Sequence, residues 1–425
     1  MKVLIISAAF PPMRAGEAEH ALHLSMHLAS RGTDVHLLTT KGQTAPEPVS
    51  FHIHATMKSW SWWDASTLLT TVRKIQPDVV LFIYTAWIYR SHPMITFAPT
   101  LVKRVLEKVS FITQIETIQE VERPQAFATR AVRKLVKYWV GSAGVDYGMG
   151  TLYRDSDRFI VLSERHLTQL CALFPEVASK TEVIPPPPLI PMCPDVQTAR
   201  NEGRARLALN QGHFLLAYFG YVDHTKGVET LLQAVQLVTK EAGSVRLVMI
   251  GGGRGTAEPA SDQRIEFVTS YAREMEMLSE RLGIADKVTW LPGYSSGSQE
   301  ASMYLYAADV CVLPFDHGVT LGRSSLAAAA AHGLPVITTE AERLESAFKH
   351  RENVFLCPPR DAQALAMAIQ LLMQDPALQQ QLRKGSAQLA DQWFSWERAL
   401  NRTLETFRVN VSSASAPRNL GYSPK

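Results

Sequence analysis

The chain has 425 residues, which is long enough for two or three domains with substantial hydrophobic cores. Hydrophobic residues make up 46% and charged residues 20%, as in ordinary globular proteins, and no apolar run reaches the roughly 18 residues that cross a bilayer. The formal net charge of +3 is too small to favour nucleic acid as a partner. Composition therefore excludes nucleic-acid-binding and membrane-spanning classes, and any membrane contact has to be peripheral.

The N-terminal stretch MKVLIISAAFPP superficially resembles a short signal peptide. Pro11 and Pro12 follow the apolar run directly and no cleavage pattern is present, so we interpret the run as a buried first strand. The four cysteines, at 171, 193, 311 and 357, have neither metal-ligand nor redox-pair spacing. That usage favours a reducing, cytoplasmic location.

Apolar runs typical of buried parallel strands alternate with amphipathic helices twice along the chain. The first series comprises predicted strands at 3–7, 34–40, 49–55, 77–84, 110–116, 157–163 and 181–185, with a helix from about Glu17 to Ser30. The second comprises predicted strands at 214–220, 245–253, 287–293, 309–315, 334–339 and 353–357. Two α/β domains are therefore expected, with a ligand cleft at the carboxyl ends of their strands.

A proline-rich stretch separates the two series. PPPPLIPMCP should form a stiff, extended connection. We accordingly predict an N-terminal domain over 1–185, a linker over 186–194 and a C-terminal domain over 195–392. The last residues, 411–425, are poor in apolar side chains and are predicted to be a disordered tail.

The stretch HGVTLGRSSLAAAAAHGLPVITT predicts a loop, a short smooth helix and a buried strand. Ser324 or Ser325 can cap the helix, and Gly333 can end it. A helix start preceded by Gly and Arg offers unpaired N–H groups and a favourable dipole to an anion. The alternative is a tightly packed α/β crossover with a decorated loop.

Glycines and cations recur where predicted strands end. Gly16 follows the first strand, Lys226 precedes the helix after the strand at 214–220, and three glycines from Gly251 close the next strand. Together with Arg323, these loops favour a diphosphate site. On the alternative interpretation, both cations are solvated surface charges.

Three further patterns each have two interpretations. WSWW at 60–63 is a sugar-stacking platform or packing beneath a loop. His20, His23 and His27 follow a helical spacing that suggests zinc, but no neighbour completes a ligand set, which favours ordinary histidines. One face of a predicted helix is basic and is either solvated or docks peripherally on an anionic membrane. That face carries Arg130, Arg133, Lys134 and Lys137.

Longer segments resemble a known family. FGYVDHTKGVETLLQAV, RLGIADKVTWLPGYSSGSQEASMYLYAADVCVLPF and HGLPVITT look like the nucleotide-binding domain of glycosyltransferase family 4, and FPPMRAGEAEHALHLSMHLASRGTDVHLLTT is similar to that family's N-terminal loop and helix. The resemblance implies an α/β fold of GT-B architecture, with two Rossmann-like doubly wound domains facing a cleft. FSWERALNRTLETF resembles the family's last helix, here 393–410, which crosses back to the N-terminal domain.

The resemblance also implies a reaction. A retaining, metal-independent hexosyltransferase would move a sugar from a nucleotide-diphosphate sugar, its co-substrate, without a cofactor. Lys226 and Arg323 would be catalytic, because cations neutralise the leaving diphosphate. Glu19 and Glu116 are candidates on the acceptor side. The donor-binding candidates are Gly16, Gly220, Lys226, Gly251, Gly252, Thr320, Gly322, Arg323, Ser324 and Ser325.

Some positions depart from the family pattern. Thr320 and Ala328 stand where many members carry two glutamates. GVTLGRSSL resembles a branch with Gly-Val-Ser-x-Arg-Arg-Gly-Ser-Leu, and Gln114 to Glu116 occupy a corner where members often have a histidine. The expected role is transfer to a glycan, lipid-linked or small-molecule acceptor in polysaccharide or cell-envelope assembly. The alternatives are an inactive subunit that binds a nucleotide sugar or glycan, and a GT-B epimerase.

Overall fold

The computed structural model describes residues 1–118, 149–251, 263–291 and 297–414. The chain forms two compact units. Unit 1 contains Met1–Ile184 together with Glu397–Lys425, and unit 2 contains Pro185–Trp396. Residues 186–190 of the proline-rich stretch are buried in unit 2, where the Trp396 indole donates to the carbonyl of Pro188 at 3.0 Å.

Unit 1 is built on a parallel sheet of seven strands in the order β3-β2-β1-β4-β5-β6-β7. The strands are β1 Lys2–Ile6, β2 Asp34–Thr40, β3 His52–Met57, β4 Val79–Tyr84, β5 Ser110–Ile115, β6 Arg158–Val161 and β7 Thr181–Val183. Every residue of β4 and β5 is buried, as a strand covered on both faces requires. All seven predicted strands are confirmed, with ends that shift by up to three residues.

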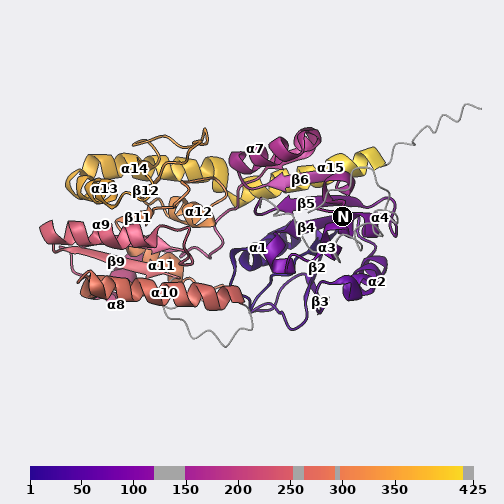
Figure 1. Ribbon diagram of the computed structural model, residues 1–425, viewed down its shortest axis with the longest axis horizontal. Coiled ribbons are helices and arrows are strands. Elements are labelled where there is room, and N and C mark those ends of the chain that lie inside the picture. The colour runs from indigo at the N-terminus through magenta and orange to yellow at the C-terminus, as the bar shows by residue number, and fades with distance from the viewer. Residues whose placement is uncertain (119–148, 252–262, 292–296, 415–425) are drawn as a thin grey trace, which may run out of the picture. The chain divides into compact units, whose positions relative to one another are not determined.

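Helices cover this sheet, with α2 beside its β3 end and α15 beside β6 and β7 (Figure 1). They are α1 Gly16–Ser30, α2 Ala65–Ile75, α3 Pro93–Thr96, α4 Ala98–Lys103, α6 Leu152–Asp155, α7 Glu164–Leu173 and α15 Trp396–Ala414, with short 3-10 helices η1 Trp62–Asp64, η2 Ala86–Tyr89 and η3 Pro175–Lys180.

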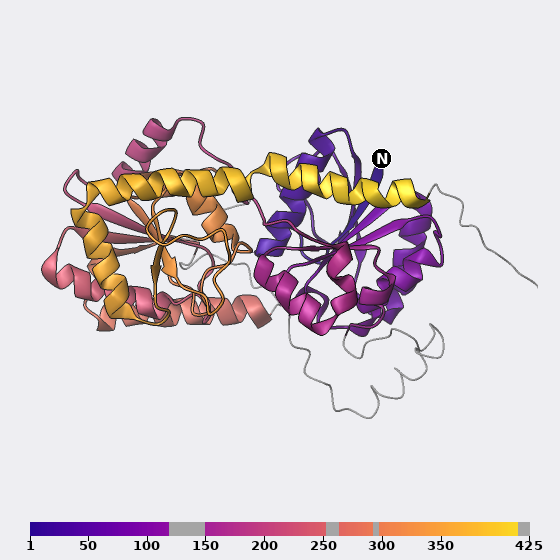
Figure 2. The ribbon, with the colours of Figure 1, turned by 90° about the horizontal axis from the view of Figure 1, so that it is seen from above.

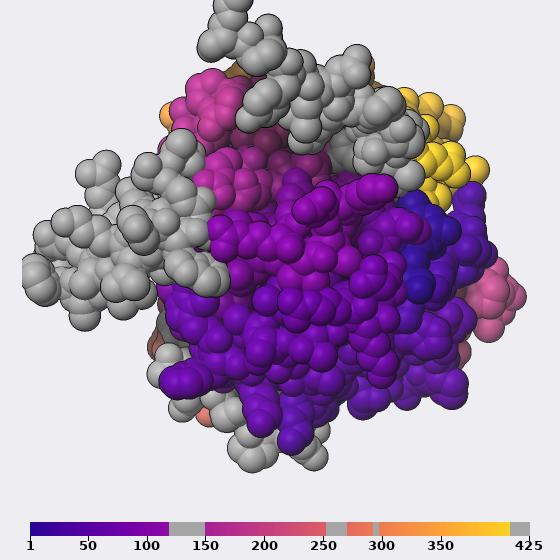
Figure 3. Space-filling model, turned by 90° about the vertical axis from the view of Figure 1, so that its right-hand side faces the viewer, coloured from indigo at the N-terminus to yellow at the C-terminus, as the bar shows by residue number. Residues whose placement is uncertain are grey.

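The last helix, which was predicted over 393–410, belongs mainly to unit 1. In Figure 2, α15 extends over the fanned strands of this unit, and in Figure 3 its yellow residues border the surface formed by the first part of the chain. Arg402 pairs with Glu182 at 2.5 Å, and Phe407 is fully buried. Because α15 runs to Ala414, residues 411–414 are helical and not part of a disordered tail. The rest of that predicted tail lies outside the described residues.

Unit 2 has a second parallel sheet, in the order β10-β9-β8-β11-β12-β13. Its strands are β8 Phe214–Phe219, β9 Val245–Ile250, β10 Val288–Trp290, β11 Val310–Leu313, β12 Val336–Thr339 and β13 Phe355–Cys357. Its helices are α8 Val196–Arg206, α9 Val228–Glu241, α10 Gln263–Arg281, α11 Glu300–Ala307, α12 Ser324–Ala331, α13 Ala362–Gln374 and α14 Pro376–Leu389, with η4 Ala285–Lys287 and the π-helical η5 Ala390–Phe394. The predicted class, two Rossmann-like doubly wound sheets, is confirmed.

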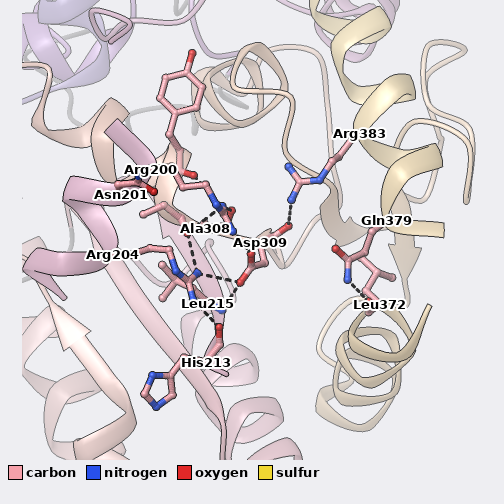
Figure 4. Close-up of polar contacts among 12 residues, drawn as sticks. Arg200, Asn201, Arg204, His213, Leu215, Ala308, Asp309, Leu372, Gln379 and Arg383 are labelled. Carbon is pink, nitrogen blue, oxygen red and sulfur yellow. Dashed lines mark hydrogen bonds and ion pairs between the residues drawn. The ribbon is translucent and has the colours of Figure 1, made fainter. Parts of the chain in front are cut away.

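A cluster of charged groups fixes the amino edge of the second sheet (Figure 4). The carboxylate of Asp309 pairs with Arg200 at 2.6 Å and with Arg204 at 3.4 Å, and it accepts the backbone N–H of Leu215 at 2.8 Å. Arg383 of α14 donates to the backbone carbonyl of Asp309 at 3.1 Å. One aspartate therefore connects α8, β8 and the start of β11.

We expect Asp309→Asn to lower the melting temperature by about 5 to 15 °C. The substitution leaves two arginines without their counter-charge, which costs about 2–4 kcal/mol where the pair is only partly exposed, and about 1 kcal/mol shifts a unit of this size by 2–4 °C. Asp286→Asn is the matched control, because Asp286 is 69% exposed and pairs only with its neighbour Lys287 at 2.7 Å among the contacts described. Thermal unfolding of both variants decides; equal melting temperatures would contradict the prediction.

Candidate active site

The strand order places the candidate donor loops of unit 2. In a doubly wound sheet, ligands bind at the carboxyl ends of the strands, where the chain reverses its direction of travel through the sheet. Here the reversal lies between β8 and β11. Lys226 lies in the loop after β8, and Arg323 lies in the loop after β11. Two loops about a hundred residues apart in sequence thus flank one position of the sheet.

The structure brings these two cations together around one aromatic ring. The Nζ atom of Lys226 lies 5.8 Å from the ring centroid of Phe315, and the guanidinium carbon of Arg323 lies 4.7 Å from it. Phe315 is 1% exposed, so the ring gives both side chains a rigid support. Asp223, 3.8 Å from Lys226, orients the ammonium further. An anion placed beside this ring can be reached from both loops.

The lysine loop needs a glycine to adopt its shape. Gly227 has a φ of 65°, in the left-handed region, and a Cβ at this position would lie 1.9 Å from the carbonyl oxygen of Pro314. The backbone N–H of Asp316 donates to the carbonyl of Thr225 at 3.1 Å. The loops after β8 and β11 therefore hold one another, and the position of Lys226 depends on this close approach.

The arginine loop is fixed by a buried carboxylate that the sequence did not single out. Glu345, which is 4% exposed, accepts the backbone N–H of Leu321 at 2.7 Å. Gly318 has a φ of 77°, and its missing Cβ leaves room for Ala341. The N–H of Val319 donates to the carbonyl of Thr339 at 2.9 Å. These contacts fix the loop through groups of the protein itself, which is what electrostatic stabilisation requires.

The start of α12 corrects one prediction. Neither serine is the N-cap, because the helix begins at Ser324 and Arg323 holds the N-cap position with extended dihedral angles. The backbone favours this placement, since the N–H of Arg323 donates to the carbonyl of Thr320 at 3.2 Å and closes a turn before the helix. The other end agrees with prediction, with Gly333 just after the helix at a φ of 62°.

The alanines of α12 pack without gaps. Ala327 to Ala330 are fully buried, and Ala328 therefore has no solvent-facing side where the family's second glutamate would stand. The His332 ring is buried as well. It contacts the carbonyl of Ala328 at 2.7 Å and the Ser302 hydroxyl at 2.8 Å. Burial lowers the pKa of His332 to about 4, so this ring is neutral at pH 7. The contacts of His332 therefore join α11, which carries Ser302, to α12, and the buried alanines of α12 are part of the core.

The remaining donor candidates lie at four places. Gly220, with a φ of 128°, lies against α12, since a Cβ there would be 3.7 Å from that of Ser325. Gly251 has a φ of 91° at the end of β9, and Gly252 lies outside the described residues. Thr320 is 5% exposed, whereas Gly322 and both serines are half-buried. Gly16 lies in unit 1 at the start of α1, with open space where a Cβ would be.

Unit 1 carries a buried pair at the carboxyl edge of its own sheet. Glu116, directly after β5, lies 3.2 Å from Nδ1 of His20 on α1 and accepts the Gln114 amide at 2.6 Å. His20 is 6% exposed. Burial alone would raise the pKa of Glu116, but the charge and hydrogen bond of His20, the hydrogen bond of Gln114 and the charge of His166 together hold this pKa below its ordinary value. A charged carboxylate therefore faces an imidazole here.

Two neighbouring carboxylates complete this edge. Glu19, the other acceptor-side candidate, lies 3.9 Å from Nε2 of His23. Glu17, which sequence reasoning passed over, accepts the Trp87 indole N–H at 2.9 Å. His20 was also missed in this role, because its helical spacing suggested only a metal-ligand pattern.

The other patterns separate in the structure. Trp60 is core packing, since it is 3% exposed and donates to the Thr40 hydroxyl at 2.8 Å, whereas Trp63 is 91% exposed. Among the described residues, the group spaced to hold a metal ion is Asp34, His36 and His52, and not the histidines of α1. The basic face of Arg130, Arg133, Lys134 and Lys137 falls outside the described residues. In the described ranges, no helix has the length and apolar character of a membrane span.

Related proteins match either nearly the whole chain or a little more than half of it. A glycogen synthase of Mycobacterium tuberculosis is 23% identical over 96% of this chain and 94% of its own. A D-inositol 3-phosphate glycosyltransferase of Xylanimonas cellulosilytica is 28% identical over 59% of this chain and 57% of its own.

Solved structures share the fold. A sucrose-phosphate synthase from Thermosynechococcus elongatus superposes with a TM-score of 0.69 at 19% identity, covering 97% of this chain and 99% of the other. Anabaena HepE, solved in complex with UDP-glucose, superposes with a TM-score of 0.67 at 16% identity, covering 96% and 100%.

Two family models match the two halves of the chain. The model described as Glycosyltransferase Family 4 matches residues 15–187, and the model described as Glycosyl transferases group 1 matches residues 199–389. Each half of the chain thus carries a glycosyltransferase domain on its own doubly wound sheet. The chain belongs to the group 1 and family 4 glycosyltransferases of GT-B architecture.

Proposed function

We propose that this glycosyltransferase is a retaining hexosyltransferase that uses a nucleotide-diphosphate sugar and needs no metal ion at the transfer site. The observation that carries the proposal is the placement of Lys226 and Arg323 on one buried ring, Phe315, where the strand order of the second sheet reverses between β8 and β11. Two fixed cations offer a diphosphate what a metal ion offers elsewhere. Because HepE was solved in complex with UDP-glucose, UDP sugars are the first donors to test.

The transfer replaces one bond at the anomeric carbon of the sugar by another. The bond between the anomeric carbon of the sugar and the diphosphate oxygen breaks, and its electron pair leaves with the diphosphate. The acceptor oxygen bonds to the same face of the anomeric carbon, and its proton passes to the leaving phosphate oxygen. Negative charge therefore grows on the phosphate in the transition state, where the two cations stabilise it more than in the ground state.

In this proposal the His20–Glu116 pair binds the acceptor. The pair lies at the carboxyl edge of the first sheet, where α/β proteins bind ligands. The carboxylate holds the imidazole in one orientation, so that the ring can hydrogen-bond an acceptor hydroxyl. The acceptor class is a glycan, a lipid-linked sugar or a small molecule of polysaccharide or cell-envelope assembly. The four free thiols are consistent with work in the cytoplasm, either free or peripherally on the membrane.

A ligand panel tests the donor half of the proposal. We expect one family among UDP, GDP, ADP and TDP sugars to raise the melting temperature, with the same affinity in EDTA as in magnesium or manganese. The hit should then be hydrolysed slowly in the absence of acceptor. Loss of binding in EDTA would contradict metal independence, and the anomeric configuration of the product by NMR decides between retention and inversion.

The competing function is an inactive subunit that binds a nucleotide sugar or glycan. The observation in its favour is the absence of the family's glutamate pair, since Ala328 is fully buried and Thr320 is 5% exposed. Binding without any donor hydrolysis, with no product from a panel of acceptors, would favour this alternative over the enzyme.

A further inference from the structure

A group of metal-type ligands lies in unit 1 away from the transfer chemistry. One ligand atom each from Asp34, His36 and His52 lies within 4.8 Å of the others. Asp34 and His52 are exposed and His36 is half-buried, so the group is open to solvent. No part of the proposed transfer uses these residues.

The strand register explains why these side chains meet. Asp34 and His36 lie near the start of β2, and His36 pairs with His52 at the start of the parallel strand β3. Residues paired in this way point to the same face of the sheet. His36 also pairs with Leu4 of β1, whose side chain packs in the same core cluster as the apolar face of α2. The group therefore lies on the α2 face, at the amino end of the edge strand.

The distance between two of the ligand atoms suits a tetrahedral ion. Nε2 of His36 lies 3.3 Å from Oδ1 of Asp34. Two ligands that each bind zinc at about 2.0–2.1 Å in a tetrahedron are about 3.3–3.4 Å apart. The His36 ring stacks on His52 with centroids 4.7 Å apart, and the ligand atom of His52 lies within 4.8 Å of the other two.

A fourth residue orients the central histidine. Nδ1 of His36 lies 2.9 Å from Nε2 of His54, two residues further along β3. When Nδ1 carries the proton and donates to His54, Nε2 presents its lone pair toward Asp34. Metal-binding histidines commonly donate their second ring N–H to a neighbouring group in this way, which fixes tautomer and ring orientation.

We propose that Asp34, His36 and His52 bind a divalent transition-metal ion of the zinc type, with water as the fourth ligand and His54 as the orienting partner. Two imidazoles and a carboxylate are ligands that zinc accepts readily. The ion connects β2 to β3, which is the edge strand of the sheet. It is structural: the site occupies the amino edge, whereas Gly16 and Glu116 lie at the carboxyl edge of the same sheet.

A neighbouring cation opposes the ion only in part. Lys2 of β1 pairs with Asp34 of β2 in the register of the sheet. Its ammonium, however, donates to the carbonyl of Ile75, at the end of α2, at 3.0 Å. That hydrogen bond directs the charge toward the helix carboxyl terminus, where a cation is favourable.

Zinc binding to the full-length chain tests the proposal. Protein stripped with EDTA is titrated with Zn²⁺ by calorimetry, and its melting temperature is followed. We expect one ion per chain, and at a hundredfold excess over the dissociation constant a rise in melting temperature of about 5 to 10 °C. His52→Ala and Asp34→Asn should each weaken zinc binding at least tenfold. Because Asp34 is exposed, we expect Asp34→Asn to fold normally.

Two comparisons make the outcome decisive. His27→Ala, on α1, removes a histidine outside the group and should bind zinc like the unchanged chain. Nucleotide-sugar binding should be equal with and without zinc, since the ion does not serve the transfer. Wild-type binding no tighter than that of His52→Ala overturns the site. A nucleotide affinity that rises with zinc and falls again in His52→Ala overturns the structural role, whatever the fate of the proposed transfer.

Discussion

Lys226→Ala and Arg323→Ala should each lower the turnover number by roughly 30- to 1,000-fold. In the proposed mechanism each side chain offers a charge-assisted hydrogen bond to the leaving diphosphate, which contributes about 2–4 kcal/mol in a dry site, and about 1.4 kcal/mol is a factor of ten. Because both side chains rest on the Phe315 ring and are partly exposed, the melting temperature should change little. Steady-state kinetics with the donor found in the ligand panel measure the effect.

Matched variants separate a specific contact from simple loss of charge. Arg323→Lys should recover only part of the activity, because an ammonium does not reproduce two parallel guanidinium contacts. Arg281→Ala and Lys384→Ala remove the same charges from exposed positions of unit 2, on α10 and α14. Equal losses in all four alanine variants, or a loss confined to stability in Lys226→Ala and Arg323→Ala, would refute the assignment.

The fold was predictable because buried parallel strands leave a strong local signal. Continuous apolar runs located all thirteen strands, and the break at the prolines separated the two sheets. Capping was less predictable, since it depends on backbone geometry that neighbouring loops impose. At α12 the turn between Thr320 and Arg323 puts Arg323, and neither of the expected serines, at the N-cap position.

The geometry of the candidate site was predictable only where position in the chain implies position in space. Lys226 and Arg323 follow strands β8 and β11, and strand ends of one parallel sheet meet at one edge. Glu345 lies 24 residues beyond Leu321, whose N–H it binds, and no local pattern marks it. The pairing of His36 with His52 likewise depends on a register between strands that sequence alone does not specify.

The His20–Glu116 pair, which we propose serves the acceptor, shows the same limit. His20 and Gln114 are 94 residues apart in sequence, and only the packing of α1 on the carboxyl end of β5 brings His20 to Glu116. Glu116→Gln should lower kcat/KM for the acceptor by roughly 10- to 150-fold, because the oriented imidazole loses a charged partner that contributes about 1.5–3 kcal/mol. Donor binding and acceptor-free donor hydrolysis should remain unchanged, which a collapsed fold would not allow.

Stability against pH supplies the independent measurement. The folded pKa of Glu116 is lower than its unfolded value, so the charged carboxylate stabilises the fold above the unfolded pKa, and this stabilisation is lost as pH falls through the folded pKa. The melting-temperature gap between wild type and Glu116→Gln should therefore be widest at neutral pH and narrow below about pH 4. The control is Glu107→Gln, which changes an exposed carboxylate ahead of β5. This variant should have the acceptor kinetics of wild type and should show no such pH-dependent difference in melting temperature from wild type. If Glu116→Gln alters donor hydrolysis as strongly as acceptor transfer, the pair serves the donor and not the acceptor.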